Sequence, residues 1–113
     1  MRLNFYTVKF QAVCPADGTS IDYAASISSA AMIRVEEIVL FTSAIAEGFQ
    51  EDIADQLYER FSSTLCLKGI HQGVLITSFR GGLEQQSACG QGWVIDHLAL
   101  LSGPTQIALG ETQ

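Results

Sequence analysis

One short stretch decides the fold: Cys14-Pro15-Ala16-Asp17-Gly18-Thr19-Ser20-Ile21-Asp22-Tyr23. It separates two runs in which apolar and polar residues alternate, residues 5–13 and 21–28. Alternation with a period of two is typical of a half-buried β-strand. Pro15 ends the first strand because proline has no backbone N–H for the ladder, and Asp17-Gly18 is a turn signal. The stretch therefore predicts an antiparallel hairpin with the thiol of Cys14 at the end of its first strand.

After this hairpin the period changes to that of a helix. Apolar side chains recur at helical spacing over residues 35–46, and again, in steps of four, at Phe49, Ile53, Leu57 and Phe61. Two further alternating runs, residues 64–70 and 74–79, follow around a turn at 71–73. The predicted order is ββααββ. Strands around a helix pair indicate an α+β fold, an antiparallel sheet with two helices packed on one face.

The length of 113 residues predicts a single domain, residues 1–113. We expect its core over about residues 3–82 and a C-terminal extension over 83–113, where residues 93–101 and 106–109 favour a further hairpin. Hydrophobic residues make up 48% of the chain, which is enough for a core, and only 16% are charged. So few surface charges indicate that copies of the chain cover part of its surface, as in a homo-oligomer.

Charge and cysteine usage exclude several classes of partner. The net charge is −6 and the six basic residues are scattered, which argues against binding to nucleic acid. We expect no membrane span, because no stretch approaches about 18 uninterrupted apolar residues, and no signal peptide follows Arg2. The three cysteines include no C-x-x-C pair, so a disulfide framework is not expected and a reducing, cytoplasmic setting is.

Cys14 and Asp22 are the first candidates for chemistry. A cysteine attacks as its thiolate, and a nearby carboxylate can carry the proton. The predicted hairpin could bring Asp22 near Cys14. The alternative is that Cys14 is a small buried thiol that only packs in the core.

Glu51 is the second candidate, because a carboxylate at a helix start can accept two N–H groups of a flat heterocycle. Its charge is equally explained by the helix dipole. Cys66, His71, Cys89 and His97 could be written into a metal site, but no pair has the tight spacing of one, so no metal is expected. Arg80-Gly81-Gly82 could hold an anion or simply form a turn.

These residues resemble a family. The element order and three motifs are similar to those of the tunnelling fold, and within it to the NADPH-dependent reductases of 7-cyano-7-deazaguanine. The family's Cys-Pro-x-Thr-Gly-x-x-Asp segment corresponds to Cys14 through Asp22, its Val-Glu-Ser to Val35-Glu36-Glu37, and its Phe-His-Glu to Phe49-Gln50-Glu51. The resemblance covers about two thirds of the chain, to roughly Gly82.

The resemblance implies a function and a set of roles. Cys14 would attack the substrate nitrile to form a thioimide, Asp22 would donate the proton, and Glu51 would hold the purine-like edge of the base. It also implies rings of subunits with sites between them. A non-catalytic homologue that kept the fold as an oligomeric binding or interaction protein is the alternative function.

Four departures from the family pattern bear on this reading. The spacing from Cys14 to Asp22 is one residue longer, Gln50 stands in place of a histidine, and Gln72-Gly73-Val74 stands in place of an Arg-Gly-Gly turn. The lysine-rich segment that holds the phosphate of NADPH has no counterpart, since Glu36 is followed by Glu37-Ile38-Val39-Leu40-Phe41. The resemblance thus implies NADPH as cofactor, while the chain lacks the motif that binds it.

Overall fold

The computed structural model describes residues 2–82, which form a four-stranded sheet and two helices. The elements follow one another as β1 (Asn4–Val13), β2 (Ser20–Ser29), α1 (Val35–Ser43), α2 (Gln50–Phe61), β3 (Thr64–His71) and β4 (Val74–Arg80). The predicted ββααββ order is confirmed, with strand ends within two residues of those expected from the alternation.

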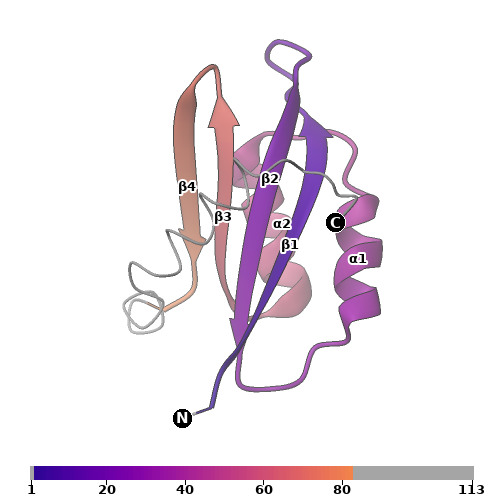
Figure 1. Ribbon diagram of the computed structural model, residues 1–113, viewed down its shortest axis with the longest axis vertical. Helices are drawn as coiled ribbons and strands as arrows, with labels where there is room; N and C mark the ends of the chain where they lie inside the picture. The colour runs from indigo at the N-terminus through magenta and orange to yellow at the C-terminus, as the bar shows by residue number, and fades with distance from the viewer. Residues whose placement is uncertain (1, 83–113) are drawn as a thin grey trace, which may run out of the picture.

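The sheet is antiparallel throughout, and its strands lie in the order β1-β2-β3-β4. Both helices cover the same face of it, as Figure 1 shows. Helix α1 packs along β1, and α2 packs over β3 and β4. This is the α+β arrangement that the sequence predicts, with two helices on one face of the sheet.

The core lies between the sheet and the helices and follows the alternation of the strands. From β2 it takes Ile21, Tyr23, Ala25 and Ile27, the set that the sequence places on one face. The other core side chains are those of Phe10, Ala12, Ile38, Ile45, Ile53, Ala54, Leu57, Leu65 and Leu67; Ile45 comes from the connection between the helices and the rest from strands and helices. The apolar residues that alternate along the strands and those that recur along one side of each helix therefore form a single apolar layer.

The helical stripes are narrower than the sequence indicates. Val35 and Val39 of α1 are 60% and 48% exposed, whereas Ile38 and Thr42 are buried. Phe49, which the four-residue steps place on the buried stripe of α2, is its N-cap residue and is 51% exposed. Phe49 lies one residue before the helical turn, so its side chain does not follow the stripe.

Some predictions fall on residues outside the described range. The C-terminal hairpin expected at residues 93–101 and 106–109 is among them. Within residues 2–82, neither helix has the length and apolar content that crossing a bilayer requires.

Gly69 in β3 allows the side chains of Tyr23 and Gln50 to pack closely against the strand. It is paired with Tyr23 across the β2–β3 ladder. A Cβ at this position would lie 2.7 Å from Cε1 of Tyr23 and 3.1 Å from Oε1 of Gln50. The missing side chain thus leaves room for a tyrosine ring and for the first side chain of α2.

We expect Gly69→Ala to destabilise the protein by about 1–3 kcal/mol, because the methyl group would overlap a ring that is fixed on all sides. Urea unfolding measures the change. Gly82→Ala is the matched control, since a Cβ there meets no atom within 4 Å, and its stability should stay near that of the wild type. Equal stability of the two variants would contradict the packing role of Gly69.

Candidate functional site

The β1–β2 turn, the start of α2 and the β3–β4 turn lie together at one end of the sheet (Figure 1). Residues from these segments and from β4 line a pocket of about 420 Å³. Its lining comes from three separate parts of the chain. The residues are Cys14, Ala16, Phe49, Gln50, Glu51, Asp52, His71 and Ile76. The volume is within the range of small-molecule sites. Cys14 and Glu51, the two candidates from separate motifs, therefore line one pocket within one chain.

The backbone around Cys14 is held on both sides. Its N–H donates to the carbonyl of Thr19 at 2.8 Å, and its own carbonyl accepts from Gly18 at 2.8 Å, which closes the β1–β2 turn. The preceding residue, Val13, donates to Ala46 at 2.9 Å and accepts from Gly48 at 3.1 Å. These bonds join the end of β1 to the connection between the helices. They fix Cys14, whose side chain is partly buried, relative to the start of α2.

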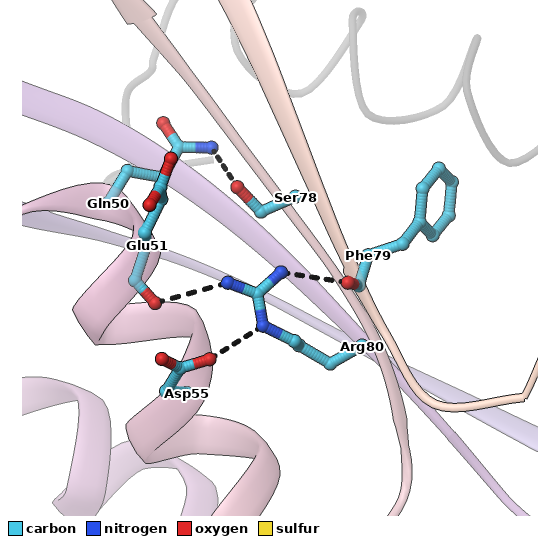
Figure 2. Close-up of polar contacts among 6 residues, drawn as sticks. All are labelled: Gln50, Glu51, Asp55, Ser78, Phe79 and Arg80. Carbon is cyan, nitrogen blue, oxygen red and sulfur yellow. Dashed lines mark hydrogen bonds and ion pairs between the residues drawn. The ribbon is translucent and has the colours of Figure 1, made fainter.

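Glu51 is the second residue of α2, and its side chain is exposed. Its backbone carbonyl accepts a hydrogen bond from Nη2 of Arg80 in β4, whose Nε donates to Oδ1 of Asp55 at 2.6 Å (Figure 2). Arg80 therefore ties α2 to β4. This contact explains the arginine of Arg80-Gly81-Gly82 without a bound anion, and it leaves the Glu51 carboxylate beside the pocket.

Gln50 is buried beneath the pocket and connects α2 to the sheet. Its Nε2 donates to the carbonyls of Leu67 at 3.1 Å and Ile76 at 2.9 Å, and it lies 3.2 Å from Oγ of Ser78. Figure 2 shows the amide directed at Ser78. Its Oε1 lies 2.7 Å from Nε2 of His71. Gln50, which stands in place of the histidine of the family pattern, therefore has hydrogen-bond partners for both its NH₂ group and its oxygen. Through the oxygen it positions a different histidine, His71, at the pocket.

Tyr23 is buried next to the same group of side chains. Its ring stacks on Phe10 and meets His71 edge-on, with ring centroids 5.9 Å apart in the second pair. Among residues 2–82 its hydroxyl has no hydrogen-bond partner. Burial, and secondly the negative charge of a Cys14 thiolate, raises the pKa of Tyr23 to about 12. Tyr23 therefore lies close to both Cys14 and His71 and stays protonated at neutral pH.

Asp22 is not brought into this pocket. Neighbouring residues in a strand point to opposite faces, and Ile21 and Tyr23 of β2 are in the core beneath the helices. Asp22 lies on the other face, where its Oδ1 accepts a hydrogen bond from Nε2 of Gln11 at 2.6 Å. Because a shift of one position in a strand reverses the face to which a side chain points, the extra residue between Cys14 and Asp22 accounts for the position of Asp22 on the face away from the pocket. The role of Asp22 as proton donor stays a prediction.

A different aspartate, Asp17, connects the β1–β2 turn to the β3–β4 turn. It accepts hydrogen bonds from the N–H and the hydroxyl of Thr19 and from Nε2 of Gln72. The bonds from Thr19, more than the one from Gln72, lower the pKa of Asp17 below its ordinary value. The turn that follows Cys14 is therefore tied to the turn that follows His71.

The residues described here do not form a metal site. Cys66 and His71 are an odd number of positions apart in β3, so they point to opposite faces of the sheet. Within residues 2–82 no three side chains of the ligating types are grouped. Cys89 and His97 lie outside this range.

The pocket also does not fit the phosphates of NADPH. Its lining carries two carboxylates, Glu51 and Asp52, and among the described residues that line it there is no lysine or arginine. A dinucleotide phosphate needs cationic or N–H donors. The absence of the lysine motif and the acidic lining therefore lead to the same conclusion. The described residues that line this pocket in one chain do not provide a site for the phosphates of NADPH.

Of the eight residues that line this pocket, two are predicted from the sequence as site residues, Cys14 and Glu51. In the sequence, Gln50 is a departure from the family pattern and His71 a candidate metal ligand. The four-residue spacing predicts Phe49 in the core. The sequence does hold one signal for the pairing of Gln50 with His71. Position 50 lacks the histidine of the family pattern, and His71 lies at the end of a strand that α2 covers.

We expect Tyr23→Phe to change how stability depends on pH. A folded-state pKa near 12 against the ordinary 10.0 means that the unfolded chain releases this proton first. Stability that is present below pH 10 is therefore lost as pH rises towards 12, by up to about 3 kcal/mol. The variant should lack this loss, and near pH 7 it should be as stable as the wild type, because the removed hydroxyl has no hydrogen-bond partner among residues 2–82.

Denaturant unfolding between pH 8 and pH 11.5 measures the effect. Tyr58→Phe is the control, since that ring is 42% exposed. Parallel pH curves for wild type and Tyr23→Phe would contradict the assignment.

Comparison with known proteins supports the fold. No protein-family model and no curated protein matches the chain. A solved structure does match, that of the archaeosine synthase QueF-Like in its apo form, with a TM-score of 0.62 and 21% sequence identity. The match covers 72% of this chain and 95% of the other. This chain therefore has the tunnelling-fold ββααββ unit that its motifs predict, and it shares that fold with an archaeosine synthase.

Proposed function

We propose that this protein binds a purine-like heterocycle of the 7-deazaguanine type in the pocket of Cys14 and Glu51, and that Cys14 adds to a nitrile on that heterocycle. The observation that carries the proposal is that a thiol and a helix-start carboxylate from separate motifs line one pocket. The fold shared with an archaeosine synthase favours the same class of ligand.

Each wall of the pocket has a part in this proposal. The half-exposed ring of Phe49 offers a flat apolar surface for a heterocycle. The carboxylate of Glu51 accepts hydrogen bonds from two adjacent N–H groups, which a guanine-like edge presents. Cys14, which lines the same pocket, attacks the nitrile carbon. The S–C bond forms, one π bond of the nitrile breaks, and the thiol proton passes to nitrogen, which gives a thioimide.

The second candidate is a non-catalytic protein that binds the same kind of heterocycle. Two observations favour it: Asp22 lies on the far face of the sheet, and the described lining offers no cation to a hydride donor. Reduction of the nitrile, the activity that the resemblance implies, needs such a donor. Under this alternative the pocket holds the ring, and Cys14 only packs against it.

The formation of a covalent adduct separates the two. With 7-cyano-7-deazaguanine, the wild-type chain should gain the full mass of the ligand, because addition across a nitrile expels no leaving group. Intact-mass spectrometry and the absorbance change of the thioimide measure this. Cys14→Ala should form no adduct. Cys66→Ala is the matched control and should react like the wild type, since Cys66 is buried and points away from the pocket.

A binding titration measures the role of Glu51. With 7-deazaguanine, which has no nitrile, Glu51→Gln should bind about tenfold or more weakly, because a charged acceptor is replaced by a neutral one. Binding without an adduct would support the non-catalytic alternative. An adduct that persists in Cys14→Ala, or unchanged affinity in Glu51→Gln, would contradict the assigned roles.

We also propose that the chain assembles with itself into a ring. The sheet order leaves β1 and β4 at the edges, each with one strand neighbour among residues 2–82. Apolar side chains on these strands are exposed: Phe5 at 43%, Val74 at 60% and Ile76 at 38%. Exposed strand edges of this kind pair with other chains. Light scattering should give the mass of an oligomer, and a monomer at micromolar concentration would rule the ring out.

A further inference from the structure

The orientation of the Gln50 amide is fixed by groups that can act in only one way. Backbone carbonyls accept hydrogen bonds and never donate them. The end of the side chain that lies 3.1 Å from the Leu67 carbonyl and 2.9 Å from the Ile76 carbonyl must therefore be the NH₂ group. These two carbonyls belong to β3 and β4, so the amide is held by two strands at once. The other end, Oε1, is then directed at His71.

This orientation determines the tautomer of His71. The amide oxygen of Gln50 can only accept, so Nε2 of His71, 2.7 Å away, must carry the hydrogen. In a neutral imidazole the other nitrogen, Nδ1, then has the free lone pair. His71 therefore presents a base at Nδ1 and, once protonated there, an acid. The hydrogen bond at Nε2 is the same in both states.

His71 and Cys14 belong to one site. Both line the same pocket, and the buried ring of Tyr23 touches His71 edge-on while its pKa responds to the charge of Cys14. The remaining ionisable groups of the lining are Glu51 and Asp52 at the start of α2. Glu51 is assigned to the heterocycle, and Asp22 lies on the far face of the sheet. Among the described lining residues of one chain, His71 is then the side chain that can take up the thiol proton at a nitrogen lone pair.

We propose that His71 is the acid–base group of this pocket and that Gln50 is its positioning residue. Nδ1 of His71 accepts the proton of Cys14 as sulfur attacks the nitrile carbon, and then delivers it to the nitrile nitrogen. The S–H bond breaks, the S–C and N–H bonds form, and one π bond of the nitrile is consumed, so no oxidant or reductant is needed. This inference rests on the proposed thioimide chemistry.

The first test separates proton transfer from binding. His71→Ala should form the adduct with 7-cyano-7-deazaguanine about 100-fold more slowly, the usual effect of losing a general acid–base group. Its affinity for 7-deazaguanine should stay within about threefold of the wild type, because the ring is held by other residues. Imidazole added to the buffer should restore part of the rate in His71→Ala. A rate within about threefold of the wild type, or no rescue by imidazole, would overturn the proposal.

The second test reads the tautomer without any reaction. A long-range ¹H–¹⁵N spectrum of the wild type should show His71 with the hydrogen on Nε2, and His97→Gln assigns the signals, because the chain has two histidines. In Gln50→Leu this preference should weaken, and adduct formation should slow by about tenfold. A wild-type His71 with its hydrogen on Nδ1 would overturn the proposal.

The two tests also distinguish failure of the proposed thiol addition from failure of the proposed role of His71. If the wild type forms no adduct although His71 carries its hydrogen on Nε2, the proposed thiol addition is wrong and the proton transfer falls with it. If the adduct forms but His71→Ala reacts at the wild-type rate, the thiol addition stands and only the role of His71 is wrong.

Discussion

The hydrogen bonds of one buried amide, that of Gln50, hold the functional end of this fold together. A glutamine at the start of a helix is normally solvated, and burying it without partners would cost several kcal/mol. Here its NH₂ group satisfies carbonyls of β3 and β4, and its oxygen meets His71. The start of α2 is therefore held over these two strands, and Phe49 and Glu51, its neighbours in the chain, are directed to the pocket mouth. Gly69 leaves the space in which this amide and the Tyr23 ring lie.

The second constraint is the pleat of the strands. It places every other residue of β2 beneath the helices, and it explains both what the sequence predicts well and what it predicts poorly. Alternation identifies Ile21, Tyr23, Ala25 and Ile27 as one buried face, and the structure confirms it. The same rule places Asp22 on the opposite face, which the alternation could have indicated. A motif match records the spacing of residues along the chain, and spacing alone does not give the face of the sheet to which a side chain points.

The fold was therefore predictable from periodicity and turn residues, whereas the site was predictable only in part. Cys14 and Glu51 could be found because each lies at the end of an element, where a loop directs a side chain away from the core. Gln50 and His71 could not be paired from sequence, because their contact depends on α2 crossing β3 at one position. Tyr23 has the sequence pattern of an ordinary core residue. Only the three-dimensional structure shows that its hydroxyl has no partner in the described part of the chain.

The charges in the pocket limit the chemistry that fits it. Two carboxylates with no described cation between them attract N–H donors and repel phosphates. A guanine-like edge satisfies the first condition, whereas a dinucleotide phosphate does not. Addition of a thiol to a nitrile moves only a proton between sulfur and nitrogen, and an imidazole with one fixed tautomer is sufficient for that. Reduction needs a second, highly anionic molecule in the same place. The acidic lining and the histidine held by Gln50 thus favour the proposed addition step over reduction. A hydride donor would have to be held by residues other than those described in the lining.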